Sequence, residues 1–163
     1  MNNTVKRIEQ KNYDYEGSID YDFIVYGTHD LVEQSYDTLA SALNRYMNEY
    51  DISTSGLARM TGIPKCTISR YLNRSSSHID KDYLAAICIA LRLRPCRMRH
   101  LFTLADKSLP DERRNDNGRN YIINEFLEGC FFDERLTVSA CNKRLNKKGL
   151  SQLTSLSFGK EDK

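Results

Sequence analysis

The sequence lacks the long apolar segments that place a protein in a membrane or direct it across one. No apolar run approaches the roughly 18 residues that span a bilayer. The opening stretch, MNNTVKRIEQKNYDYEG, has no apolar core of the kind that a secretion signal needs. We therefore expect a cytoplasmic protein that makes no membrane contact.

An excess of charge of one sign is also missing from the chain as a whole. Lys and Arg number 24 against 22 for Asp and Glu, so the formal net charge is only +2. Such a total gives no signal for nucleic acid. Divided along the chain, however, the net charge is −4 over residues 1–36, −2 over 37–51, +7 over 52–100 and +1 over 101–163. An acidic front therefore masks a basic centre.

Cysteines and histidines are few, and their spacing is not that of a disulfide framework, a metal site or a catalytic pair. The five cysteines form no Cys-x-x-Cys pair, which argues against a disulfide framework or a zinc knuckle, and we expect reduced packing residues. His29, His78 and His100 are scattered, so no metal site is predicted. The sequence also has no Gly-rich phosphate loop and no plausible Cys/His pair. It therefore predicts a protein that is not an enzyme and needs no cofactor.

The length limits how many folded units the chain can hold. Its 163 residues, 40% of them hydrophobic, allow one domain of ordinary size and a small accessory piece. Residues 1–36 are predicted to be an N-terminal arm, because residues 1–18 are polar. An alternation of apolar and acidic residues further along this arm predicts a short strand over 19–26.

Five helices are predicted between residues 37 and 105, where apolar side chains recur at spacings of three and four. Ser53 and Asp80 have the chemistry of N-caps, because their oxygens can accept from the free amides of the following turn. Gly62-Ile63-Pro64 is predicted to separate the second helix from the third, since Gly accepts the left-handed conformation and Pro suits the first position of a helix. The expected helices are 37–49, 54–61, 65–73, a helix after Asp80 with Tyr83, Leu84, Ile87, Cys88 and Leu91 on its inward face, and one over about 96–105.

Beyond residue 105 the sequence predicts a linker and a second, smaller helical unit. Residues 106–118 contain almost no apolar side chains and are predicted to be the linker. Residues 119–150 are predicted to form a helical hairpin, which a tail over 151–163 follows. Two short helices bury only a small core, so the hairpin either docks on the central domain or binds a partner. The inward residues expected of its two helices are Tyr121, Ile122, Phe126, Leu127, Cys130 and Phe131, and then Val138, Cys141 and Leu145.

The second and third predicted helices have the pattern of a helix-turn-helix, which is two short helices joined by a tight turn that contains Gly. At roughly 100° per residue, Ile68, Tyr71 and Leu72 lie on one side of the third helix, which defines its buried face. The opposite side has the size and the donors to enter a major groove, where Arg or Lys reaches guanine. The residues predicted to be presented there are Lys65, Cys66, Ser69 and Arg70.

These residues belong to a longer pattern that resembles a known family. The pattern is Leu57-Ala58-x-x-x-Gly62-Ile63-Pro64-x-x-Thr67-Ile68-Ser69-Arg70-Tyr71-Leu72-Asn73, followed by Tyr83-Leu84-x-x-Ile87-x-x-Ala90-Leu91. It resembles the lambda-repressor-like helix-turn-helix family, also called the Cro or XRE family. The resemblance covers about residues 37–105. It implies an all-α domain of five helices whose third helix reads DNA bases. The helical hairpin and a partly extended N-terminal segment, predicted above from the sequence pattern, are additions to this domain.

The resemblance also implies roles for individual residues. The base-reading positions of the family fall on Lys65, Cys66, Ser69 and Arg70. Its phosphate-contacting positions fall on Ser53, Thr54, Thr67 and Asn73. Arg74 stands where the family usually has Gly, and we add it to the phosphate-contacting set. Cys66 replaces the polar or amide side chain that is common at its position.

The function that the resemblance implies is sequence-specific DNA binding by a transcription regulator. Its partner is then double-stranded DNA, bound by a homodimer on a two-fold operator, because one helix in one groove gives little specificity. The hairpin at 119–150 and the segment at 19–36 are the candidate dimer surfaces. The alternative is a protein-interaction or antitoxin-like adaptor in which the helix-turn-helix fold has lost DNA binding.

The densest basic run lies at the junction of the fourth and fifth predicted helices. It consists of Arg92, Arg94, Arg97, Arg99 and His100. These side chains either contact phosphates or form a solvated or partner-facing surface. The sequence leaves both alternatives open.

Overall fold

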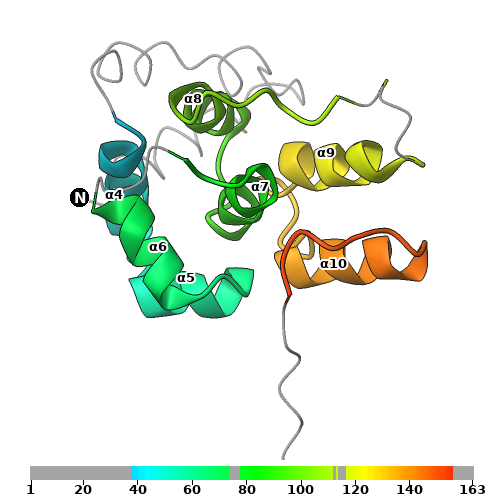
Figure 1. The fold of residues 1–163 in the computed structure, drawn as a ribbon, viewed down its shortest axis with the longest axis horizontal. Helices are drawn as coiled ribbons and strands as arrows, with labels where there is room; N and C mark the ends of the chain where they lie inside the picture. Colours follow the sequence, from blue (N-terminus) through cyan, green and yellow to red (C-terminus); the bar gives the residue numbers. More distant parts are fainter. Residues whose placement is uncertain (1–37, 74–77, 112, 114–116, 156–163) are drawn as a thin grey trace, which may run out of the picture.

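Over the described residues, α-helices connected by loops form the protein, and no strand is present (Figure 1). The computed structural model describes residues 38–73, 78–111, 113 and 117–155, and over these ranges the all-α prediction is confirmed. The arm at 1–36, with its predicted strand at 19–26, lies outside the described residues. The helices are α4 (Leu39–Glu49), α5 (Thr54–Thr61), α6 (Lys65–Leu72), α7 (Lys81–Ala90), α8 (Pro95–Leu104), α9 (Arg119–Gly129) and α10 (Val138–Lys147).

The starts of four helices are fixed by side-chain caps that the sequence encodes locally. The Ser53 hydroxyl accepts from the amide three residues further on at 3.0 Å, and the Asp80 carboxylate accepts from the amide two residues further on at 2.8 Å. Both predicted caps are thereby confirmed. Thr38 and Thr137 cap α4 and α10 in the same way. Each cap satisfies an amide that has no partner inside its helix.

Helix α7 is the centre of the fold, and it is buried on all sides. Figure 1 shows it between α4, α5 and α6 on one side and α9 and α10 on the other. Every residue from Leu84 to Ala90 is buried. The prediction of a single inward face was therefore too narrow, because Ala85, Ala86 and Ile89 are buried as well. A helix that is apolar around its whole circumference is typical of the middle of a core.

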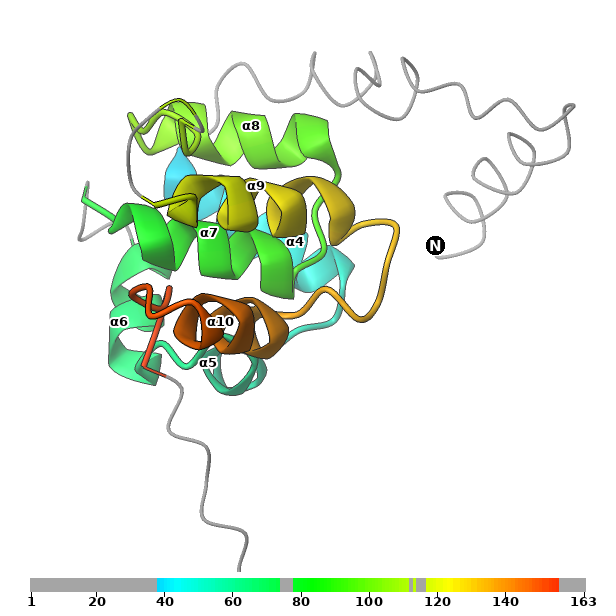
Figure 2. The ribbon, with the colours of Figure 1, turned by 90° about the vertical axis from the view of Figure 1, so that its right-hand side faces the viewer.

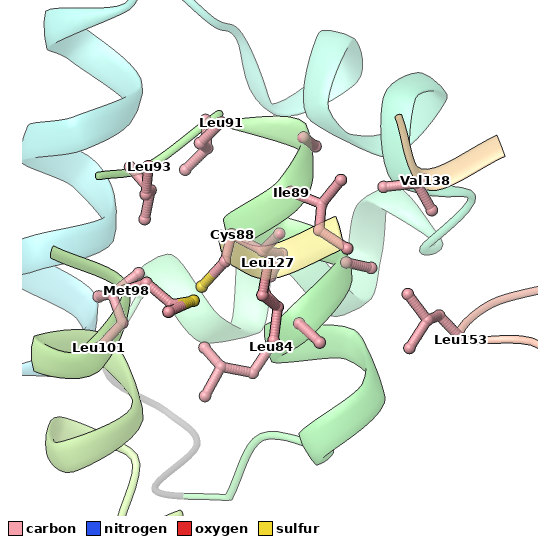
Figure 3. Packing of buried hydrophobic residues seen from close by; sticks show 14 of the residues in the cluster. Leu84, Cys88, Ile89, Leu91, Leu93, Met98, Leu101, Leu127, Val138 and Leu153 are labelled. Carbon is pink, nitrogen blue, oxygen red and sulfur yellow. The ribbon is translucent and has the colours of Figure 1, made fainter. Parts of the chain in front are cut away.

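The predicted hairpin docks on the other helices. Helix α9 packs against α7 and α8, and α10 packs against α5, α7 and α9. Figure 2 shows α9 in front of α7, with α8 and α10 on either side. Figure 3 shows Leu127 of α9 and Val138 of α10 in the same cluster as Leu84 of α7. One continuous core thus joins α4–α8 to α9 and α10.

One residue of α9 is oriented differently from the prediction. Tyr121 was expected to face inward, but it is 57% exposed. Ile122 and Ile123, each 1% exposed, make up the buried start of the helix instead. The aliphatic pair takes the inward position, and the tyrosine ring projects towards solvent.

Polar contacts also tie the hairpin to the rest of the fold. The Arg119 guanidinium pairs with the Asp82 carboxylate at 2.7 Å and donates to the Ser151 carbonyl at 2.9 Å. Within the predicted linker, Leu109 packs against the core, and the Pro110 carbonyl accepts from the Asn124 side chain at 2.9 Å. No helix of the described residues is long and apolar enough to cross a membrane.

Candidate nucleic-acid interface

Helix α6 has one buried side and one exposed side, as its sequence predicts. Ile68 is 1% exposed and Tyr71 is 5% exposed, and both belong to the core. Lys65, Cys66 and Arg70 are exposed on the outer side of the helix. The predicted orientation of α6 is therefore confirmed. Its outer face carries two long cationic side chains that can donate to an acceptor on another molecule.

The remaining residues predicted to bind DNA lie on or beside α5 and α6. Ser69 and Thr67 are half-buried on α6, and Asn73 is exposed at its C-terminal end. Ser53 is exposed and Thr54 half-buried at the start of α5. Arg74 lies outside the described residues.

A left-handed glycine sets the direction in which the chain leaves α5. Gly62 has φ 74°, and its amide donates to the Ala58 carbonyl at 2.8 Å. Non-glycine residues are strained in this conformation, so the predicted role of Gly62 follows from its missing Cβ. The next helix begins at Lys65, as expected, but Pro64 occupies the N-cap position of α6 rather than its first helical position.

Thr61 fastens this turn with its side chain. Its hydroxyl donates to the Leu57 carbonyl at 2.7 Å and accepts from the Ile63 amide at 3.2 Å. Thr61 is fully buried, and Ile63 is 1% exposed. The turn between α5 and α6 is thus held from inside by one hydroxyl and one apolar side chain, which limits how far α6 can tilt relative to α5.

The other end of α6 is held by a residue that the sequence analysis missed. The Asn44 side chain of α4 donates to the Leu72 carbonyl at 3.1 Å and to the Ala40 carbonyl at 2.8 Å. It therefore satisfies one of the last carbonyls of α6, which have no partner inside the helix. No local pattern indicates this contact, because the two residues are 28 positions apart.

The N-terminal end of α5 has donors that suit an anion. The first amides of a helix have no partner within it, and the helix dipole favours negative charge there. The Ser53 oxygen accepts from the Gly56 amide, which leaves its own hydroxyl hydrogen to be donated outward. The amides of Thr54 and Ser55 precede the first amide that bonds within the helix, that of Leu57 to the Ser53 carbonyl at 2.8 Å.

The charge around α5 and α6 is of one sign. The sequence contains no Asp or Glu between Ile52 and Ile79, and Arg59, Lys65 and Arg70 are all exposed. An acid-free stretch with exposed cations produces a positive surface potential, which attracts a polyanion.

The dense basic run contributes little to this surface, because most of its arginines contact other parts of the same chain. Arg97 donates to both Glu49 carboxylate oxygens at 3.0 Å and to the Tyr50 hydroxyl at 3.3 Å. Its guanidinium also lies 5.0 Å from the centroid of the Tyr46 ring, and its side chain is only 11% exposed. Burial raises the pKa of the Tyr50 phenol above its ordinary value, although the Arg97 charge lowers it. Arg97 therefore joins α8 to α4.

Two further arginines of the run hold the end of α9. Arg92 donates to the Cys130 carbonyl at 3.0 Å and lies 3.5 Å from the Glu134 carboxylate. The Arg94 guanidinium lies 5.3 Å from the centroid of the Phe131 ring. Three of the four arginines thus contact α4 or the residues that follow α9, and the structure favours an internal role over a phosphate-contacting one.

Replacing Arg97 by Ala is expected to lower the free energy of unfolding by about 1–3 kcal/mol, because a charge-assisted hydrogen bond is lost and the Glu49 carboxylate loses its partner. Urea unfolding measures this loss. Arg135→Ala, which removes an exposed arginine paired with Asp133, serves as the control and should leave stability nearly unchanged. Equal effects of the two substitutions would show that Arg97 does not join α8 to α4.

The cysteines divide into one exposed thiol and four buried ones. Cys66 is exposed on α6, whereas Cys88, Cys96, Cys130 and Cys141 are buried. Burial raises the pKa of Cys130 to about 11 and that of Cys141 to about 12, so these thiols stay protonated at neutral pH. No group of three or more His, Cys, Asp or Glu among the described residues is arranged to hold a metal ion.

Comparison with known proteins finds a DNA-binding family in this part of the chain. Residues 42–96 match a family model described as a Cro/C1-type HTH DNA-binding domain. The match begins in α4 and ends in α8, so it contains the whole of α5, α6 and α7. No curated protein and no solved structure matches the chain significantly.

Proposed function

We propose, from the premise that residues 42–96 are a Cro/C1-type helix-turn-helix DNA-binding domain, that this protein is a sequence-specific, non-enzymatic transcription regulator. The observation that carries the proposal is the orientation of α6. Its Ile68 and Tyr71 side chains are buried, while Lys65 and Arg70 project from a surface whose sequence is free of acidic residues. A helix of this size and polarity fits the major groove of DNA.

Base reading is assigned to the outer face of α6. Arg70 and Lys65 have donors for the O6 and N7 atoms of guanine, and the Ser69 hydroxyl can bond either a donor or an acceptor. Cys66 lies on the same face. Its thiol is small and weakly polar, so it is suited to apolar contact with a base edge rather than to a bidentate hydrogen bond.

Phosphate binding is assigned to the residues that flank this face. Ser53 and Thr54 bring the amide-rich end of α5 to one phosphate, where the helix dipole favours the negative charge. Thr67, Asn73 and Arg74 supply further donors from α6 and the residue after its C-cap. These contacts fix the position of the protein on the duplex and carry no sequence information themselves.

The proposal includes a homodimer on a two-fold operator. A single reading helix spans only a few base pairs, and two copies related by a two-fold axis double the length of sequence that is read. Each protomer would place its α6 in the major groove of one half-site. The two half-sites would then lie about one helical turn of DNA apart.

Selection of bound sequences from random duplex DNA at physiological salt tests the function directly. We expect enrichment of a two-fold motif whose half-sites contain guanine, because the long cationic donors of α6 favour that base. The half-site spacing in the enriched motif would also report the geometry of the dimer. Absence of any enrichment would contradict sequence-specific binding and would favour the protein-interaction adaptor.

Salt dependence separates the two functions independently of sequence. If several phosphates are neutralised, the logarithm of the affinity should fall with the logarithm of salt concentration with a slope of about −3 or steeper. An adaptor that has lost DNA binding would retain no duplex even at low salt. Its partner would instead be a protein that co-purifies with it.

A further inference from the structure

The buried polar residues of the described structure form one connected network. They are Thr61, Asn142 and Thr154, which are 0%, 0% and 4% exposed. The Thr154 hydroxyl donates to the Thr61 carbonyl at the end of α5. The Asn142 side chain of α10 donates to the Thr154 carbonyl at 3.0 Å and accepts from the Leu153 amide at 2.8 Å. The network therefore links the segment after α10 to the last residue of α5.

Thr154 acts on the peptide group that defines the helix-turn-helix. The carbonyl of Thr61 and the amide of Gly62 belong to the same rigid peptide plane. The Gly62 amide bonds to Ala58 inside α5, and the Thr61 carbonyl bonds to Thr154 from outside it. Both the amide and the carbonyl of this peptide group therefore have a hydrogen-bond partner. Because the orientation of this plane sets where the chain turns towards α6, the Thr154 hydroxyl, 93 residues away, contributes to the position of α6.

Apolar side chains do not fill all the space between α5, α7 and α10. A pocket of about 420 Å³ lies between the C-terminal half of α5, the end of α7 and the start of α10. Arg59 and Met60 line it on one side, and Thr137, Val138 and Ser139 on the other. Val138 at the start of α10 is buried, but this pocket separates part of that start from α5, whereas the segment that follows α10 makes a buried hydrogen bond to α5. Figure 1 shows this segment running back along α10 towards α5.

We infer that residues 151–155, through Thr154 and its support Asn142, are part of the DNA-reading unit and position the α5–α6 turn. This inference rests on the proposed function and deepens it, since it assigns a role in DNA binding to residues outside the 42–96 match. Thr154 and Asn142 are positioning residues. They are buried, so they act through Thr61 and Gly62 and not by touching DNA.

Substitutions of Thr154 in the full chain test the inference. Thr154→Val keeps the shape of the side chain but removes its donor, and we expect about fivefold weaker binding to the duplex recovered by selection, or to a random-sequence duplex at low salt. Thr154→Ser keeps the hydroxyl and should bind as the natural protein does. Thr103→Val removes a hydroxyl that bonds to the Arg99 carbonyl on α8, at an exposed position outside the α5–α6 turn, and is the control for the substitution itself.

Amide hydrogen exchange gives a readout that does not depend on DNA. Exchange at Gly62 and Ile63 should be about tenfold faster in Thr154→Val, and unchanged in Thr154→Ser and Thr103→Val. A folded Thr154→Val protein with natural exchange at the turn would overturn the inference, and so would natural affinity for a duplex that the unaltered protein binds. If the unaltered protein binds no duplex, the proposed function fails and the role of these residues in DNA reading fails with it. The exchange rates then decide separately whether Thr154 holds the turn.

Discussion

Replacing Arg70 by Ala is expected to weaken binding to the selected duplex by about 10- to 100-fold, because a bidentate contact between arginine and guanine contributes about 1–3 kcal/mol of discrimination. The substitution should also relax the base preference at one position of each half-site. Arg70 is exposed in the last turn of α6, and the core residues of that helix are Ile68 and Tyr71. The fold should therefore be unaffected, and titration of labelled duplex at fixed salt measures the loss.

Arg113→Ala is the matched control for this experiment. Arg113 is also exposed, carries the same charge and lies outside the α5–α6 surface, where it pairs with Asp111 at 3.2 Å. Its loss should change affinity by less than about twofold, which reflects only the general electrostatic attraction. If Arg70→Ala and Arg113→Ala weaken binding equally, α6 does not read bases through Arg70. If neither weakens it, the positive surface of α5 and α6 is not the DNA-binding surface.

Replacing Leu127 by Ala is expected to destabilise the whole described fold by about 2–5 kcal/mol, because a large apolar side chain is removed from a closed core. Leu127 is 1% exposed and belongs to the same cluster as Leu84 of α7 (Figure 3). Since α7 contacts both α5 and α9, the loss should extend from the hairpin to the helix-turn-helix. Unfolding is therefore expected to stay a single transition with a lower midpoint.

Urea unfolding followed by circular dichroism, together with amide exchange in α5 and α6, measures this effect. Tyr121→Ala on the same helix is the control, since its 57% exposed ring should contribute less than about 0.5 kcal/mol. Two separate transitions, with α5 and α6 unaffected by Leu127→Ala, would show that the hairpin is an independent unit. In that case the predicted linker at 106–118 would separate two domains.

Local signals in the sequence were sufficient to predict the helices and their ends. Ser53 and Asp80 act as caps within their own first turns, and Gly62 ends α5 by a property of its own backbone. The buried side of α6 also follows from spacing alone, because Ile68 and Tyr71 are three residues apart on a regular helix. Each of these features depends on neighbours within a few residues.

Features that depend on distant partners were not predictable in the same way. One clue to the central place of α7 is present in the sequence, since Leu84 to Ala90 contains no polar residue. Helical spacing alone nevertheless predicts a single apolar face. Nothing near Arg97 indicates that its partner is Glu49, 48 positions earlier. Nothing near Thr154 indicates that its acceptor is the Thr61 carbonyl. Such contacts exist only after the chain has folded, so they require the structure.

The burial of α7 on all sides means that part of its surface is uncovered while the chain is still being synthesised. A chain is synthesised from its N-terminus, so α4 to α8 are complete before α9 and α10 exist. During that interval the side of α7 that α9 and α10 later cover is exposed, including Ile89. The Thr61 carbonyl also lacks its donor until residue 154 has been added. The nascent helix-turn-helix thus passes through a period with an exposed apolar face, which favours association with other chains until α9 and α10 have been made.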